Sequence, residues 1–438
     1  MYTFERQAYE ERTRWFQEAR FGLFLHWGLY SIPARGEWVR NSEEMPEEAY
    51  MPFFREFDPV DFDPVKWARL AKEAGMRYAV LTAKHHDGFC LFDSALTDFK
   101  STRTPCGRDL VKEFLDAFRA EGLKVGLYYS LLDWHHPDYP HYGDLHHPMR
   151  HNPECGNEER DFNRYLTYLH GQVRELCENY GKLDIMWFDF SYGDMRAETW
   201  KGHELVDMVR RLQPGILIDN RLEASGEGFG SLTSAHPQPC HGDFVTPETM
   251  IPPYRLRNEL GEPVVWESCI TMNNHWGYCA NDRSYKPASL LIRKLVECVS
   301  KGGNMLLNVG PDARGNFPEQ SVQILQGIGT WMKKNRESIY GCTASDLPKP
   351  EYGRITQCGN VLYYHLFEPV LGPVPLTGIH PEQLGSIRLL SDGHEIPVSH
   401  HWCHSSYPQL AFADLGEEPL LPDETDTVLK VTLKEEPA

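Results

Sequence analysis

The sequence contains no apolar run of about 18 residues, and its charge is not basic. It has 44 Lys and Arg against 63 Asp and Glu in 438 residues, a formal net charge of −19. A membrane-spanning helix needs about 20 mainly apolar residues, so no span is expected. An acidic chain repels phosphate backbones and anionic lipids. We therefore expect neither nucleic acid nor a membrane as a partner.

Three short motifs are also missing. The 11 cysteines are odd in number and include no Cys-x-x-Cys pair, which disfavours a disulfide framework or a zinc ribbon. The opening residues, 1–6, carry charge and no apolar stretch follows, so no secretory signal is expected and the predicted location is cytoplasmic. No Gly-x-Gly-x-x-Gly follows the first predicted strand, which argues against a dinucleotide site. We expect no cofactor.

What the chain does contain is a regular alternation of short apolar runs and amphipathic segments. One helix, 63–74, has Asp63 as N-cap, Pro64 in its first turn and Gly75 after its end. The pattern indicates a parallel sheet covered by helices. The predicted strands are 21–27, 78–83, 124–130, 183–189, 216–221, 264–267 and 305–309, and the other predicted helices are 109–121, 160–180, 198–212, 288–300 and 319–335.

Polar residues recur at the carboxyl ends of many of these strands, which favours a closed barrel over an open sheet. We therefore predict an α/β fold with a (β/α)8-like TIM barrel in residues 1–342. Short strands and Pro- and Gly-rich turns then replace the helical pattern, and predict a small C-terminal β-sandwich in residues 343–438. Two long irregular stretches, 133–157 and 223–262, have the length of functional loops.

The fourth predicted strand ends in a carboxylate. Strand alternation places Ile185, Trp187 and Asp189 on one face, which in a barrel is the interior, so Asp189 would lie at the rim above Trp187. A single strand-end Asp is more often a cap or turn residue. Other strand ends, however, carry further polar side chains, and buried polar groups need partners. A small polyhydroxylated ligand would pair with this set, which consists of His26, His85, His86, Tyr128 and Arg221.

Hydrolysis of a glycoside needs a second carboxyl group on the other side of the sugar. The sequence offers Glu248, in a loop, and Glu267, at the end of a predicted strand. A loop residue can reach over a bound sugar, whereas a strand-end Glu more often makes a fixed structural hydrogen bond. We favour Glu248 as the acid/base, and Glu267 stays an alternative that would still contact the substrate.

The histidine-rich loop is a candidate metal site. Its histidines lack the short fixed spacing on a helix that metal ligands usually have, and the first strand ends in His26-Trp27-Gly28 rather than His-x-His. We therefore expect no metal. The histidines concerned are His135, His136, His141, His146, His147 and His151.

Many ordered segments between about residue 10 and residue 340 resemble glycoside hydrolase family 29, the α-L-fucosidases. The most specific are the first-strand segment Trp15 to Trp38 and the run Lys84 to Phe89. The others are Gly126 to Trp134, Trp187 to Asp189, Asn220-Arg221, Gly242 to Glu248, Trp266-Glu267, Trp276 to Tyr278 and Gly302 to Pro311.

The resemblance implies a retaining exo-α-L-fucosidase that releases terminal fucose from fucosylated oligosaccharides or glycoconjugates. It implies Asp189 as nucleophile, and the Thr246-Pro247-Glu248 pattern resembles the branch that prefers α-1,3/1,4 linkages. Two alternatives stay open: a barrel glycosidase for another sugar of related configuration, and a fucose-binding protein without catalysis. The sequence does not indicate the oligomeric state. The fucose pocket implied by the resemblance consists of His26, Glu37, Trp38, His85, His86, Tyr128, Trp187, Arg221 and Trp276.

Overall fold

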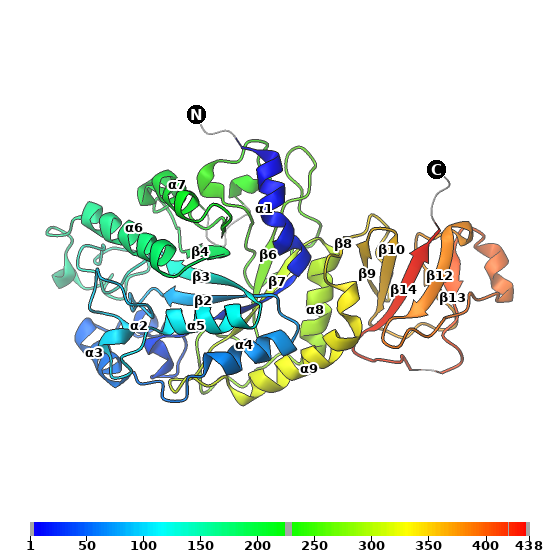
Figure 1. Cartoon of the computed structure of the whole chain (residues 1–438), viewed down its shortest axis with the longest axis horizontal. Coiled ribbons are helices and arrows are strands. Elements are labelled where there is room, and N and C mark those ends of the chain that lie inside the picture. Colours follow the sequence, from blue (N-terminus) through cyan, green and yellow to red (C-terminus); the bar gives the residue numbers. More distant parts are fainter. Residues whose placement is uncertain (1–3, 224–229, 419, 435–438) are drawn as a thin grey trace.

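The computed structural model describes residues 4–223, 230–418 and 420–434. Part of the predicted loop 223–262, residues 224–229, therefore lies outside the described residues. The larger part of the chain is built around one parallel sheet of seven strands (Figure 1). The strand order is β5-β4-β3-β2-β1-β7-β6. The strands are β1 Phe21–Leu25, β2 Tyr78–Lys84, β3 Lys124–Ser130, β4 Ile185–Asp189, β5 Leu217–Ile218, β6 Glu267–Thr271 and β7 Asn304–Val309.

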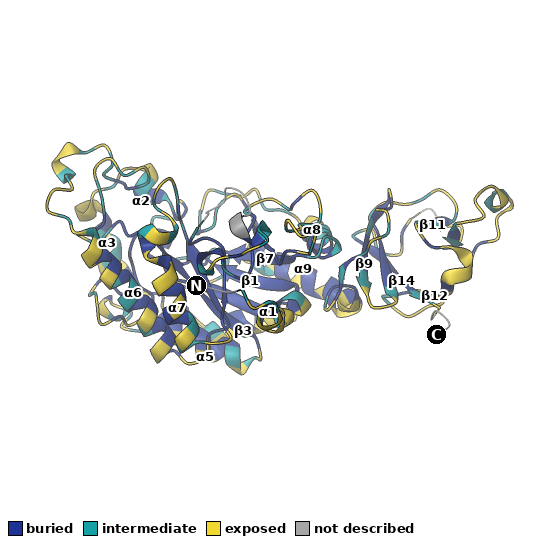
Figure 2. Ribbon diagram, turned by 90° about the horizontal axis from the view of Figure 1, so that it is seen from above, coloured by how far each residue is buried: buried dark blue, intermediate teal, exposed yellow. Residues whose placement is uncertain are grey.

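Helices cover the outer face of this sheet, and their exposed sides face solvent while the strands are buried (Figure 2). At the predicted helix start, the side chain of Asp63 accepts hydrogen bonds from the backbone N–H groups of Val65 and Lys66. No helix in the described ranges is long and apolar enough to cross a membrane. The helices are α1 Arg6–Ala19, α2 Val39–Ser42, α3 Glu47–Glu56, α4 Pro64–Glu73, α5 Leu110–Ala120, α6 Phe162–Asn179, α7 Gly202–Leu212, α8 Ala288–Ser300 and α9 Glu319–Asn335. The first three were not predicted.

The two edge strands of the sheet, β5 and β6, are joined by an irregular segment. Within it, Phe244 forms a parallel bridge to Asp219, which follows β5, and Glu248 forms one to Cys269 in β6. The backbone N–H of Val245 also donates to the carbonyl of Val265 at 3.0 Å. The segment thus occupies the position of an eighth strand with only isolated bridges, and the domain is barrel-like.

One predicted strand was misplaced. The sequence suggested a strand at 264–267 that ends in Glu267, whereas β6 begins at Glu267. In a parallel sheet the first residues of all strands lie at the same end, and Glu267 pairs with Asn304, the first residue of β7. Glu267 is therefore at the amino end of the barrel-like sheet, opposite the rim.

The remaining chain forms antiparallel sheets beside α8 and α9 (Figure 1). Along β10, Leu362 and Tyr364 face a core shared by both sheets, while Tyr363 between them joins the core of the barrel-like part. The predicted second domain is thus a sheet domain, and its boundary between residues 342 and 343 stays a prediction. A five-stranded sheet contains β8 Thr343–Ala344, β9 Gly353–Cys358, β10 Val361–Leu366, β12 Leu384–Leu389 and β14 Thr427–Leu433, and a two-stranded sheet pairs β11 Val374–Leu376 with β13 Ala411–Ala413.

Candidate active site

A small pocket opens at the carboxyl ends of the parallel strands. The structure brings together ten of the twelve residues singled out in the sequence, and leaves Glu37 and Glu267 outside the lining. The ten are His26, Trp38, His85, His86, Tyr128, Trp187, Asp189, Arg221, Glu248 and Trp276, and they are joined by Phe24, Phe190 and Cys269.

Asp189, the last residue of β4, is held from two sides. Its Oδ2 accepts a hydrogen bond from the hydroxyl of Tyr128 at 2.7 Å. Its Oδ1 accepts one from Nη1 of Arg221 at 2.8 Å. Tyr128 and Asp189 come from the neighbouring strands β3 and β4, whose residues 128 and 187 are in register. The side chain is only 10% exposed, and these two contacts fix its orientation.

Arg221 connects the two candidate catalytic carboxylates. Its Nη2 lies 2.8 Å from Oε2 of Glu248, while Nη1 binds Asp189. Its Nε donates to Oγ1 of Thr246 at 2.8 Å, and its guanidinium stacks over the ring of Trp187 at 4.5 Å. Burial acts to lower the pKa of Arg221, but the carboxylates of Glu248 and Asp189 outweigh it and raise the pKa. The cation therefore persists between them.

The histidines of the pocket are neutral acceptors or donors rather than cations. The hydroxyl of Ser130 donates to the carbonyl of Leu132, so Nδ1 of His86 must donate to Ser130 Oγ, 2.7 Å away. Burial lowers the pKa of His86 well below 6.5. Its Nε2 therefore presents a lone pair, 3.9 Å from Oδ2 of Asp189. Two acceptors at that separation leave room for a hydroxyl donor between them.

On the opposite wall, Asn308 of β7 binds the side chain of His26 and the backbone of Trp276. Its amide nitrogen donates to the carbonyl of Trp276 at 2.7 Å, and its Oδ1 lies 2.7 Å from Nδ1 of His26. Nδ1 of His26 thus carries the proton and Nε2 is free to accept. Burial lowers the pKa of His26 to about 3. Nearby, Nδ1 of His85 is buried and has no hydrogen-bond partner among the described residues, as expected for a group that waits for a ligand.

Glu37 lies behind the pocket wall. Its Oε2 accepts a hydrogen bond from the backbone N–H of Gly277 at 2.7 Å, next to Trp276. Burial raises the pKa of Glu37. The structure thus gives Glu37 a contact that holds the Trp276 segment in place, and it does not place the carboxylate in the pocket lining.

Glu267 lies at the other end of the sheet. It is fully buried, and its Oε2 accepts a hydrogen bond from the hydroxyl of Tyr78, the first residue of β2. Burial raises its pKa to about 8, against smaller lowering effects of Tyr78 and Trp187. This position is beneath Trp187 rather than beside Asp189.

Sequence reasoning missed several residues that shape the site. Phe190 directly follows Asp189, adopts a φ of 83°, and lies against Trp38 and His86. Because Phe190 directly follows the strand-end Asp189, the sequence alone could have placed it at the rim. Asn308 and Thr246 lie inside segments that resemble the family, but their contacts join parts of the chain far apart in the sequence. Within the predicted functional loop 133–157, His146 reaches the same aromatic wall and contacts Phe190 at 4.8 Å.

Comparison with known proteins bears directly on this geometry. The family model for α-L-fucosidase matches residues 1–337. The chain belongs to the α-L-fucosidase family. Its activity is therefore that of a glycoside hydrolase acting on α-L-fucosides.

Solved and curated fucosidases agree with this assignment. The chain is 55% identical to α-L-fucosidase isoenzyme 1 from Paenibacillus thiaminolyticus, with a TM-score of 0.94 over 98% of this chain and 100% of that one. It is 29% identical over 415 residues to the human plasma α-L-fucosidase, covering 88% of this chain and 82% of that protein. A fucosidase from Bacteroides thetaiotaomicron, solved as a trapped covalent intermediate, is 26% identical with a TM-score of 0.82, over 97% of this chain and 96% of that one.

Proposed function

We propose that this fucosidase releases terminal L-fucose with retention of configuration, through a covalent intermediate on Asp189. The observation that carries the proposal is the bridge made by Arg221, which binds Asp189 on one side and Glu248 on the other. Retaining glycosidases use two carboxyl groups about 5 Å apart, one as nucleophile and one as acid/base. The Bacteroides relative, trapped as a covalent intermediate with 2-fluoro-fucosyl fluoride by means of a Glu-to-Gln variant, supports the same chemistry.

Both carboxyl groups act in each of the two steps of the proposed reaction. Asp189 attacks the anomeric carbon and displaces the glycosidic oxygen, while protonated Glu248 gives its proton to that oxygen. Glu248 then takes a proton from water, which attacks the same carbon and releases Asp189. Glu248 suits this role because it is 36% exposed on its side chain and lies in a loop, where it can meet both the leaving group and water.

We further propose that the pocket residues bind fucose as the resemblance implies. Nε2 of His86 and Nε2 of His26 accept hydrogen bonds from sugar hydroxyls. Nδ1 of His85, which has no partner among the described residues, makes a third hydrogen bond to the sugar. The rings of Trp38 and Trp276 offer flat apolar faces to the sugar carbons. Glu37 acts through the Trp276 segment rather than by direct contact.

The linkage preference is the least constrained part of the proposal. We propose α-1,3 and α-1,4 linkages on branched acceptors, supported by the Thr246-Pro247-Glu248 pattern and by the loop 133–157 at the pocket wall. A panel of fucosylated oligosaccharides with α-1,2, α-1,3, α-1,4 and α-1,6 linkages, scored by released fucose, tests this. Faster release from α-1,2 or α-1,6 substrates would contradict it.

Product NMR and variant kinetics test the proposed mechanism, and substrate tests separate it from the two alternative functions. Proton NMR of the first product should show α-fucose before mutarotation, and β-fucose first would mean inversion. Glu248→Ala should lose about 10²- to 10³-fold on poor leaving groups and recover with azide on an aryl fucoside. If Glu267→Ala shows that rescue instead, Glu267 is the acid/base. Equal hydrolysis of the matching galactoside, or fucose binding without turnover, would favour the two alternative functions.

Several predictions concern the cellular setting and stay predictions. The cytoplasmic location is supported by the 11 cysteines, all of which are free. The expectation that neither nucleic acid nor a membrane is a partner rests on the net charge of −19. The hydrolysis proposed here requires no cofactor or metal, because two carboxyl groups suffice for it.

A further inference from the structure

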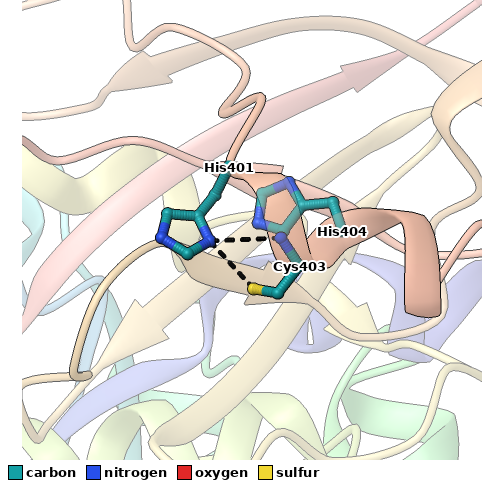
Figure 3. Close-up of side chains that lie close together, drawn as sticks. All are labelled: His401, Cys403 and His404. Carbon is teal, nitrogen blue, oxygen red and sulfur yellow. Dashed lines mark hydrogen bonds between the residues drawn. The ribbon is translucent and has the colours of Figure 1, made fainter.

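A group of potential metal ligands lies on the sheet domain, away from the pocket. It is formed by His401, Cys403 and His404, in and just before the short 3-10 turn Trp402–Ser406 (Figure 3). This turn lies in the connection between β12 and β13, at the far end of the molecule from the barrel-like sheet (Figure 1).

The three ligand atoms already converge. They all lie within 4.8 Å of one another, and Nδ1 of His401 is 2.9 Å from Sγ of Cys403. A tetrahedral Zn²⁺ holds nitrogen at about 2.0–2.1 Å and sulfur at about 2.3 Å, which sets its ligands roughly 3.3–3.8 Å apart. The cluster therefore needs shifts of about 1 Å or less per side chain.

The ring of His404 is fixed as metal-binding rings usually are. It stacks on Phe412 of β13, with centroids 3.9 Å apart and planes 11° apart. Its Nδ1 faces the carbonyl of Ser399 at 3.2 Å. A carbonyl can only accept, so Nδ1 carries the proton and Nε2 keeps its lone pair for a ligand. A carbonyl behind the ring is a common second contact of zinc-bound histidines.

The contact between His401 and Cys403 points to what the ion would replace. The thiol of Cys403 donates to Nδ1 of His401, which also accepts from the backbone N–H of Cys403 at 3.5 Å (Figure 3). Metal binding removes the thiol proton and puts the ion between sulfur and nitrogen. A thiolate with two imidazoles suits a borderline-soft ion such as Zn²⁺, with water as fourth ligand.

A second group of three such residues offers a contrast. Glu198, His203 and Cys240 also come within 4.8 Å of one another. There, Glu198 and His203 already form an ion pair at 2.7 Å, and burial raises the pKa of Cys240 to about 12. A buried thiol beside a carboxylate resists the deprotonation that zinc requires, so this group is a useful negative control.

We propose that His401, Cys403 and His404 bind one Zn²⁺ ion with a water as fourth ligand. The ion braces the connection between β12 and β13 against Phe412 and takes no part in hydrolysis. The geometry of the three residues, together with the fixed ring of His404, carries this proposal independently of the pocket chemistry.

The test uses the full chain, reduced, stripped with a chelator and dialysed against Zn²⁺. Wild type should retain one equivalent, measured by elemental analysis, and Co²⁺ in its place should give a thiolate-to-cobalt charge-transfer band in the near ultraviolet. Cys403→Ser should abolish the band, and should weaken Zn²⁺ binding by more than the roughly 10- to 100-fold that loss of a contact supporting a ligand costs. The matched control is Cys358→Ser, which removes an exposed cysteine elsewhere on the same domain and should change neither.

Other outcomes would overturn the proposal. One of them is stoichiometric Zn²⁺ retained by Cys403→Ser but lost in His203→Ala, which would assign the ion to the second group. Another is a wild type that retains no more Zn²⁺ than Cys403→Ser. Cys403→Ser should hydrolyse an aryl fucoside at the wild-type rate, and a loss of turnover would contradict the accessory role. If that variant misfolds by circular dichroism, His401→Ala and His404→Ala provide the same comparison.

Discussion

Two buried carboxyl groups, one at each end of the barrel-like sheet, are held in opposite ways. At the rim, Asp189 faces the cation Arg221 and the hydroxyl of Tyr128. At the amino end, the partners of Glu267 among the described residues are the uncharged groups of Tyr78 and Trp187, and burial raises its pKa to about 8. The comparison shows that burial alone favours a neutral acid, whereas a neighbouring buried cation favours the charged carboxylate that the proposed nucleophile requires. Residue type and burial do not separate these two roles, but their partners do.

Removal of the rim carboxylate, Asp189, tests the role proposed for it most directly. Asp189→Gly should lower kcat on an aryl fucoside by about 10³- to 10⁵-fold, because no group can then form the covalent intermediate. Azide should restore part of the turnover and yield a fucosyl azide of inverted configuration. The matched control is Asp184→Asn, at the residue directly before the same strand, where the carboxylate pairs with Lys124. Near-normal turnover of Asp189→Gly would remove the nucleophile assignment.

Replacement of Arg221 by Lys should reduce activity less than the loss of Asp189 does. Arg221→Lys keeps a positive charge but cannot hold Asp189, Glu248 and Thr246 at once. We expect kcat/KM to fall about 10- to 100-fold. The decisive measurement is how this loss divides between kcat and KM: kcat should fall more than KM rises, because Arg221 orients both candidate catalytic carboxylates. A rise in KM alone at unchanged kcat would mean that Arg221 only shapes the pocket.

The support of the pocket wall should matter less. Asn308→Ala removes the hydrogen bonds that orient His26 and Trp276. Two lost hydrogen bonds of about 1 kcal/mol each predict a 10- to 30-fold rise in KM. The value of kcat should change less, because Asp189 and Glu248 are untouched. A fall in kcat at constant KM would instead point to a role in the chemical steps.

The sequence predicted the frame of this site better than its details. Strand alternation placed Trp187 and Asp189 on the interior face, and the structure has both in the pocket lining. The helix start at Asp63 was also correct, because capping depends on adjacent residues. Such local rules explain why the family's barrel-like sheet was predictable from one chain.

Contacts between distant segments were not predictable in the same way. Glu267 was expected at a strand end, but Val264 and Val265 before it belong to the irregular stretch beside Val245, and the strand starts at Glu267. A shift of four residues along one strand moves a side chain from the rim to the amino end of the sheet. The roles of Asn308 and Thr246 likewise depend on which strands become neighbours, which only the fold decides.

The smallest expected effect on turnover, and the clearest on stability, concerns Glu267. Its pKa is about 8 when folded and near 4.5 when unfolded, so between these values the folded state binds more protons. Stability from this group is therefore complete below about pH 4.5 and is lost as pH rises through about 8.

Glu267→Gln keeps the shape and neutral charge, so it should remove this dependence while changing kcat no more than a few-fold. The readout is urea unfolding at pH 6 and pH 9, where the free-energy gap between wild type and Glu267→Gln should move in favour of the variant at pH 9. If that gap is the same at both pH values, Glu267 is ionised throughout, and the contrast between the two ends of the sheet is wrong.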